Sequence, residues 1–146
     1  MDCRWIEGND RIDAAVYMGQ GGMEGGLAAA DVILGNICPS GRLADTFAGT
    51  LEDYPSTKGY HDSFDYVDYT EDIYVGYRFF ETFEGASDRV IYPFGYGLAY
   101  TSFDIEVLGA VKKEDTIIFN VKVTNTGRMA GKEVVQLYVL APSGRR

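Results

Sequence analysis

The sequence predicts an α/β remnant, made of a strand, a loop and a helix, followed by an incomplete all-β sandwich of the immunoglobulin-like kind. Two observations lead to this fold class. An apolar run that ends in glycines precedes an alanine-rich helical pattern, and a period-two alternation begins after Ser102. The composition, with 46% hydrophobic and 14% aromatic residues, is that of a chain able to bury a core.

The first predicted elements are a strand and a helix. Residues 11–18 are an apolar run that ends in the glycines of residues 19–22, which is typical of a buried strand entering a loop. Residues 24–34 are rich in alanine and leucine and stop at Gly35, which predicts a helix. Leu27, Ala30 and Leu34 recur at helical spacing, so we expect that stripe to pack on the strand.

The middle of the chain is an aromatic, acidic connector. Residues 73–80 have strong strand composition, whereas residues 92–98 are rich in aromatics and glycine and have no regular period. Flexible linkers lack large aromatic side chains, so we expect this connector to be ordered.

The last part of the chain alternates apolar and polar residues. Three half-buried strands are predicted, with a turn at residues 125–127 after the second, and an immunoglobulin-like sandwich needs about seven. The three alternating stretches are residues 103–108, 117–124 and 135–139.

Charge and cysteine content exclude several function classes. The net charge of -9 opposes binding to nucleic acid and to anionic membranes. Cys3, Cys38 and the single His61 have no metal-ligand or redox spacing, so we expect two free buried thiols and neither metal nor cofactor. No apolar run reaches the length of about 20 residues that a membrane helix needs, and no signal peptide is recognisable, so a soluble chain of unknown localisation is expected.

Five motifs in order resemble the β-glucosidase type of glycoside hydrolase family 3. They are a glycine and helix segment with PSGRL, the short LEDYP sequence, an aromatic YTEDIYVGYR, the YPFGYGLAYT segment, and VTNTG with GKEVVQLYV. They occupy residues 23–47, 51–55, 69–78, 92–101 and 123–139.

The resemblance implies a C-terminal piece of such an enzyme. In the domain order of that family, residues 1–60 would be the C-terminal part of the α/β sandwich domain. Residues 61–101 would be a connector, and residues 102–146 would be the first strands of a truncated fibronectin type III-like module. The missing catalytic barrel and both catalytic carboxylates are then expected upstream of Met1, so no catalytic residue is assigned here. The partner implied for the intact enzyme is a carbohydrate substrate.

Local features offer weaker candidates. Asp62, Asp65, Asp68 and Glu71 are spaced by three, and could bind calcium or act as acid and base, or could be a solvated acidic surface. Because family loops near this point can approach the substrate pocket, Tyr69 and Glu71 are the candidates for substrate binding.

Two further motifs have structural interpretations. The glycine loop at residues 19–26 matches neither the G-x-G-x-x-G spacing of dinucleotide-binding loops nor the lysine and serine or threonine of a P-loop. We therefore expect its glycines to allow close packing of strand and helix. Arg78 lies among aromatic residues and is expected to pair with a carboxylate rather than with substrate.

Three hypotheses about function therefore remain. In the first, the chain is part of a hydrolase that cleaves O-glycosyl bonds of β-glucosides or related β-glycosides, and its own residues have a structural or pocket-wall role. The alternative is a non-catalytic module, either a carbohydrate-binding one that stacks aromatic rings on sugars or an accessory β-sandwich.

Overall fold

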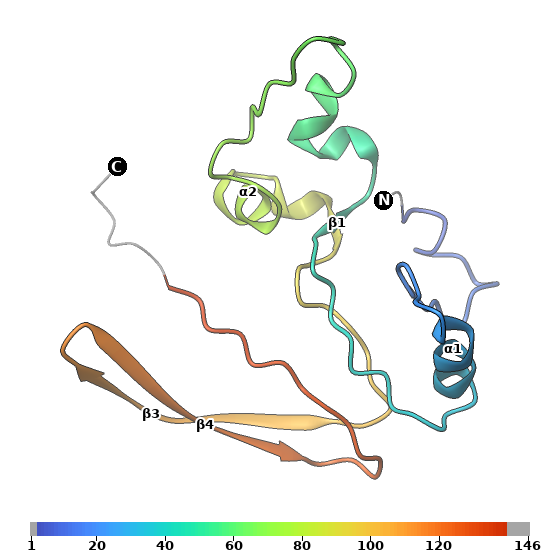
Figure 1. Ribbon diagram of the computed structural model, residues 1–146, viewed down its shortest axis with the longest axis vertical. Coiled ribbons are helices and arrows are strands. Elements are labelled where there is room, and N and C mark those ends of the chain that lie inside the picture. The colour runs from blue at the N-terminus through green and yellow to red at the C-terminus, as the bar shows by residue number, and fades with distance from the viewer. Residues whose placement is uncertain (1–2, 140–146) are drawn as a thin grey trace. The chain divides into compact units, whose positions relative to one another are not determined.

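The computed structural model describes residues 3–139, which divide into two compact units. The first unit comprises Met1–Gly26 and Gly41–Gly97, and the second comprises Leu27–Ser40 and Leu98–Arg146. Regular secondary structure is limited to a few helices and two antiparallel two-stranded sheets (Figure 1). Residues 140–146 of the predicted last module lie outside the described residues.

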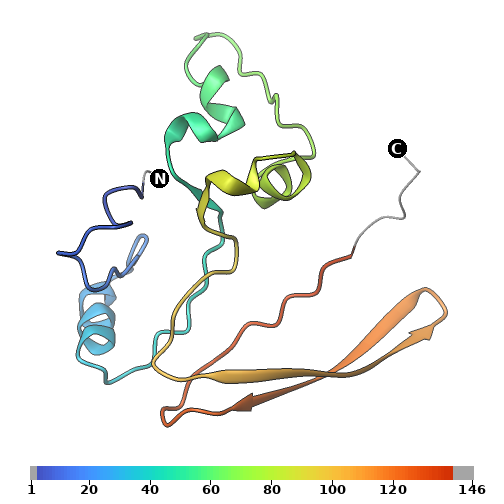
Figure 2. The ribbon, with the colours of Figure 1, turned by 180° about the vertical axis from the view of Figure 1, so that it is seen from behind.

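The first unit is built from short elements. Its strands β1 (Phe47–Ala48) and β2 (Val90–Tyr92) pair in antiparallel fashion, as the ribbon seen from behind also shows (Figure 2). Three 3₁₀ helices, Leu51–Asp53, Pro55–Gly59 and Ser87–Arg89, and the helix α2 (Tyr77–Thr82) complete it. Its core is small, with Ala48, Phe80 and Ala86 buried and with Tyr54, Phe79 and Val90 packed around them.

The strand predicted over residues 73–80 is wrong, because this segment turns into helix α2. Gly76 precedes the helix with a φ of 64°, which glycine adopts at little cost. The helical turn brings the rings of Phe79 and Phe83, four residues apart, to 5.0 Å, and buries Phe80. Tertiary packing of these rings therefore outweighs the β propensity of the sequence.

The strand predicted over residues 11–18 is also not formed. These residues have no regular secondary structure, and Val16, Tyr17 and Met18 are exposed. A strand exists only when its backbone pairs with a neighbour, and no described residue forms a strand ladder with this segment.

The helix predicted over residues 24–34 is confirmed as α1 (Gly25–Ile33). It ends in a Schellman motif, in which the N–H of Asn36 donates to Asp31 and that of Gly35 donates to Val32, with Gly35 at a φ of 75°. The expected packing of its stripe is wrong, since Leu27, Ala30 and Leu34 are all exposed. Packing needs a covering element, and no described element covers this face.

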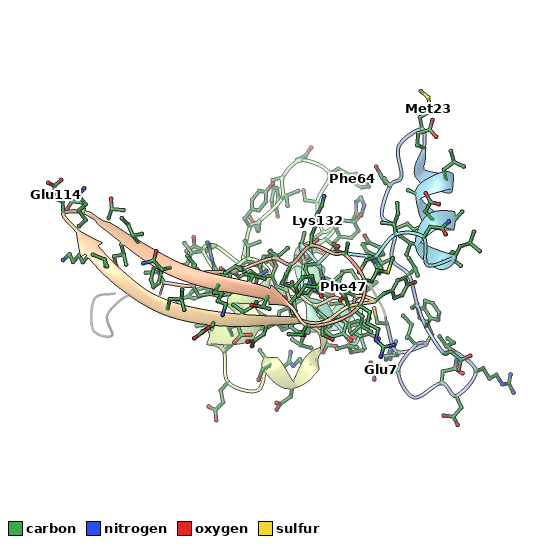
Figure 3. All side chains as sticks on the ribbon, turned by 90° about the horizontal axis from the view of Figure 1, so that it is seen from below. Glu7, Met23, Phe47, Phe64, Glu114 and Lys132 are labelled. Atoms are coloured by element: carbon green, nitrogen blue, oxygen red, sulfur yellow. The ribbon has the colours of Figure 1, made fainter. Side chains whose placement is uncertain are left out.

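The second unit also holds a long hairpin of β3 (Phe103–Lys113) and β4 (Thr116–Asn125) (Figure 1). Two of the three predicted strands are thus confirmed, while the third, at residues 135–139, forms no ladder with any residue that the structure describes. Glu114 lies at the tip of the hairpin with a φ of 51° (Figure 3). The predicted half-burial is wrong, because apolar side chains such as Ile105, Val111 and Ile118 are exposed on both faces.

Hydrogen bonds at the base of the hairpin close the turn predicted at residues 125–127. Asn125 accepts from the hydroxyl of Thr101 at 2.7 Å and from the N–H of Gly127 at 3.0 Å, and its amide donates to Met129 at 2.8 Å. The N–H of Thr126 donates to the carbonyl of Ser102 at 2.8 Å. The asparagine in this motif therefore has a structural role, as one side chain bonds to the Thr101 hydroxyl and to two backbone groups of the turn.

Candidate functional site

The two predicted substrate-binding residues lie on one turn of the connector. The carbonyl of Tyr69 accepts from the N–H of Asp72 at 3.3 Å, and that of Glu71 accepts from the N–H of Tyr74 at 2.8 Å. Asp72 has a φ of 49° in the left-handed region, which tightens the turn. Tyr69 is 86% exposed and Glu71 is half-buried, so the tyrosine ring is available to a partner.

The acidic residues that precede this turn are exposed. Asp62, Asp65 and Asp68 all lie at the surface, and the hydroxyl of Ser63 accepts from the N–H of Asp65 at 3.1 Å. Among residues 3–139, no group of three or more histidine, cysteine, aspartate or glutamate side chains is placed to hold a metal ion. The three aspartates are therefore solvated carboxylates on an acidic surface of the connector.

Among residues 3–139, Arg78 has no carboxylate partner of the kind that the sequence predicts. Its guanidinium Nη1 donates to the backbone carbonyl of Ile73 at 3.2 Å, which closes the turn before α2. The structural role is retained, but the acceptor is a neutral carbonyl, because the helical turn of α2 places Arg78 over the residues that precede it.

The glycine loop is open rather than closely packed. A Cβ at Gly22 or Gly26 would meet nothing within 4 Å. In this loop, only a Cβ at Gly21 would lie close to another residue's backbone, 3.1 Å from the Cα of Gly25. Met23 in this loop is fully exposed and projects from the ribbon (Figure 3). The predicted close contact between strand and helix is therefore absent from the described residues.

Sequence reasoning missed a hollow in the first unit. Its volume is about 240 Å³, and its lining residues are Asp45, Thr46, Phe47, Tyr54 and Gly76. The segment that follows the PSGRL motif supplies three of these five, so the motif itself was the available signal.

Tyr54 organises the backbone beside this hollow. Its hydroxyl donates to the carbonyl of Thr46 at 3.2 Å and accepts from the N–H of Ala48 at 2.7 Å. Burial raises the pKa of Tyr54, and the hydrogen bond from Ala48 opposes that rise. The Oγ1 of Thr46 is buried without a hydrogen-bond partner among the described residues.

Comparison with known proteins establishes the family. The model of the glycosyl hydrolase family 3 C-terminal domain matches residues 1–100. The chain therefore belongs to glycoside hydrolase family 3 and corresponds to a C-terminal part of its members.

Two curated relatives of this chain are named as β-glucosidases. The chain is 53% identical to Beta-glucosidase A of Butyrivibrio fibrisolvens over 99% of its own length, and 52% identical to a Beta-glucosidase of Ruminococcus albus over 90%. It spans only 19% and 13% of those two proteins.

Solved structures agree with this assignment. A β-glucosidase from Paenibacillus barengoltzii matches 87% of this chain at 49% identity with a TM-score of 0.77, and the match covers 14% of that enzyme. A β-glucosidase of Kluyveromyces marxianus in complex with glucose matches 71% of this chain at 39% identity with a TM-score of 0.65, over 12% of that enzyme. The described residues contain no helix long and apolar enough to cross a membrane.

Proposed function

We propose that this chain is part of an enzyme that hydrolyses O-glycosyl bonds of β-glucosides or related β-glycosides, and that its own residues support the catalytic part. The observation that carries the proposal is the family match over residues 1–100 together with relatives that are β-glucosidases. A retaining glycosidase needs two carboxylates about 5 Å apart, one of them kept protonated by its surroundings. The aspartates of the connector are exposed and lack such surroundings, so the catalytic pair comes from the part of the enzyme that this chain does not span.

The test is a chimera in which this chain replaces the matching segment of the Butyrivibrio Beta-glucosidase A. The chimera is expected to hydrolyse nitrophenyl β-glucoside, whereas this chain alone and the relative without its segment are not. Turnover by this chain alone at the rate of the whole relative would overturn the assignment of catalysis to the rest of the enzyme. A folded chimera without hydrolysis would overturn the supporting role.

Within this function, Tyr69 and Glu71 belong to the wall of the substrate pocket. The exposed ring of Tyr69 can stack on a sugar, and the carboxylate of Glu71 can accept hydrogen bonds from sugar hydroxyls. In the chimera, Tyr69→Ala and Glu71→Gln should raise KM several-fold and leave kcat nearly unchanged. Tyr66→Ala and Glu84→Gln, which make the same changes at exposed residues outside the turn, are the controls. Equal KM values in all four variants would remove this role.

The alternative, a carbohydrate-binding module, is favoured by one observation. Phe64, Tyr66 and Tyr69 are more than 60% exposed in one short segment, and Phe64 points away from the ribbon (Figure 3). Calorimetric titration of the chain alone with cellobiose distinguishes the two functions, since binding by the isolated chain is expected only of such a module.

The hairpin β3–β4 is proposed to open a fibronectin type III-like sandwich, and residues 1–60, 61–101 and 102–146 remain the proposed domains. The exposed apolar face that carries Ile105, Val107 and Val123 supports this, because such a face needs a covering sheet. Ile117→Cys should react quickly with a thiol reagent in the chain alone and at least about tenfold more slowly in the chimera. Equal reaction rates would refute the covered sheet.

A further inference from the structure

The side chains that line the hollow in the first unit accept hydrogen bonds more readily than they donate them. Asp45 is exposed, and an ionised carboxylate is an acceptor only. The hydroxyl proton of Tyr54 is already donated to the carbonyl of Thr46, and the same oxygen accepts from a backbone N–H. Phe47 and Gly76 carry no polar side-chain atom. The hollow is therefore suited to a molecule that brings donors.

Thr46 adds a polar group that is not yet used. Its side chain is 4% exposed, and its Oγ1 has no hydrogen-bond partner among the described residues. Buried polar atoms in folded proteins nearly always have a partner, because leaving one without a partner costs free energy. A donor seated in the hollow is placed to supply this partner, since Thr46 is one of the residues that line it.

The charge around the hollow is negative. Burial is the main cause of the raised pKa of Tyr54, and the charges of Asp53 and Asp45 raise it further, so both carboxylates act on the phenol. Asp53 is engaged by Thr50, whose N–H and hydroxyl donate to it at 2.8 and 3.0 Å. Asp45 is therefore the carboxylate that is left to a ligand, and the field at the hollow attracts a cation and repels an anion.

Two aromatic rings complete the wall of the hollow. Phe47 meets the ring of Tyr17 edge to face at 5.5 Å, and Tyr54 meets that of Phe80 edge to face at 5.8 Å. Such a contact covers at most one face of each ring. The face of an aromatic ring attracts a cation, and a planar guanidinium also stacks on it.

The size of the hollow limits its occupant to a small group. Its volume of about 240 Å³ is below the roughly 300–1,000 Å³ of pockets that hold drug-sized ligands. A small planar cation fits such a space, and so does the end of one long side chain.

We propose that this hollow binds a guanidinium group, with the carboxylate of Asp45 as its ion-pair partner and the Oγ1 of Thr46 as a further acceptor. The rings of Phe47 and Tyr54 supply the surface on which the guanidinium stacks. A guanidinium carries only donors, which matches a wall of acceptors. A sugar also needs donors for its oxygen atoms, and the lining side chains offer it none except the hydroxyl of Thr46.

The guanidinium has two possible sources. One is a free small guanidinium compound, and the other is an arginine side chain from the part of a family 3 protein that this chain does not span. The proposal is independent of the proposed hydrolysis, since it concerns a group that binds in the first unit of this chain and not the cleavage of a glycosidic bond.

Titration of the chain with methylguanidinium chloride, followed through amide chemical shifts by NMR, tests the site. We expect saturable shifts at the residues that line the hollow, and none with methylurea, which has a similar shape but no charge. Asp45→Asn should weaken binding at least about tenfold, while Asp62→Asn, at an exposed aspartate of the connector, should not. Equal shifts with methylurea, or equal affinity in Asp45→Asn, would overturn the proposal.

Thr46→Val separates binding from folding. Valine is close to threonine in shape and removes a hydroxyl that has no partner, so the stability of the chain should stay equal or rise. The affinity for methylguanidinium should fall several-fold, whereas Thr46→Ser, which keeps the hydroxyl, should retain it. A Thr46→Val variant that binds like the wild type would overturn the role of this hydroxyl as an acceptor.

The same titration of the chimera with Beta-glucosidase A distinguishes the two sources. Equal binding by the chimera and by this chain identifies a free compound. Binding by this chain alone, together with a lower melting temperature of the chimera in Asp45→Asn, identifies an arginine of the rest of the enzyme. Loss of binding in the chimera without any effect of Asp45→Asn would overturn the proposal.

Two further outcomes are informative. Saturable shifts with glucose and none with methylguanidinium would identify a sugar site in the hollow and overturn the proposal. An inactive chimera that still binds methylguanidinium would support the proposal and count against the proposed hydrolysis alone.

Discussion

The phenol oxygen of Tyr54 lies 2.7 Å from the backbone nitrogen of Ala48, whose side chain is fully buried. The same hydroxyl donates to the carbonyl of Thr46, so one side chain satisfies two backbone groups on either side of Phe47. This contact fixes the start of β1 beside the hollow, because a buried backbone group without a partner is costly.

Tyr54→Phe should therefore open the start of β1. The N–H of Ala48 loses its acceptor, at a cost of about 1–3 kcal/mol for a buried donor. The amide of Ala48 is expected to exchange at least about tenfold faster, as measured by NMR. Tyr66→Phe, which removes a hydroxyl from an exposed ring, serves as the control, and an unchanged Ala48 amide would show that water replaces the hydroxyl.

The ionisation of Tyr92 should respond to Glu7. Burial first, and then the negative charge and hydrogen bond of Glu7, raise the pKa of Tyr92 above its ordinary value of 10.0. Glu7→Gln removes the charge, so Tyr92 should ionise at lower pH than in the wild type, as followed by phenolate absorbance. Glu24→Gln, a change in the glycine loop, should leave the curve in place.

This shift also has a consequence for stability at high pH. Because the folded-state pKa of Tyr92 is raised, its contribution to stability is complete below the unfolded-state value of 10.0 and is lost as pH rises through the folded-state value. Glu7 acts on ionised Tyr92 through charge repulsion and through the lost hydrogen bond. If charge repulsion dominates, alkaline unfolding should begin at a higher pH in Glu7→Gln than in the wild type. Coincident phenolate titrations of the wild type and Glu7→Gln would exclude the contact.

Gly127 is the position at the base of the hairpin that tolerates no side chain. A Cβ there would lie 2.9 Å from the backbone nitrogen of Ser102 and 3.1 Å from the Cα of Thr101, and backbone atoms cannot move aside cheaply. Gly127→Ala should cost about 1–3 kcal/mol and break the bond from Thr126 to Ser102. Faster exchange of the Thr126 amide is the expected result, with Gly22→Ala, where a Cβ meets nothing, as the control.

The isolated chain should self-associate at micromolar concentration. The hairpin exposes Val107, Leu108 and Val111 at 65%, 59% and 57%, and large apolar surfaces near open strand edges promote aggregation. Sedimentation velocity should show oligomers, and a Val107→Lys and Val111→Lys double variant should shift them toward monomer. A wild-type chain that sediments as a monomer and melts in one sharp transition would contradict this expectation.

Patterns that depend on near neighbours in the chain were predicted correctly. Helix α1 follows from its alanines and from Gly35, which adopts the left-handed conformation of a helix end. Strands β3 and β4 follow from alternation, and the order of five motifs identified the family. For the candidate site, the sequence pointed to Tyr69 and Glu71 through a resemblance, and their role in substrate binding stays a prediction.

Features that depend on distant contacts could not be predicted. The hollow beside Tyr54 was missed because no local sequence pattern predicts that the Tyr54 hydroxyl forms hydrogen bonds with the backbone of Thr46 and Ala48. Arg78 was assigned the wrong kind of partner because its acceptor depends on the helical turn of α2.

The sequence by itself determined the family, helix α1 and the long hairpin, because propensity, turn chemistry and alternation are local properties of the chain. Only the tertiary structure decided that residues 73–80 enter a helix, since the packing of Phe79, Phe80 and Phe83 outweighs their β propensity. It also decided that residues 11–18 form no strand ladder within residues 3–139, because a strand exists through hydrogen bonds to a partner and not through its own composition.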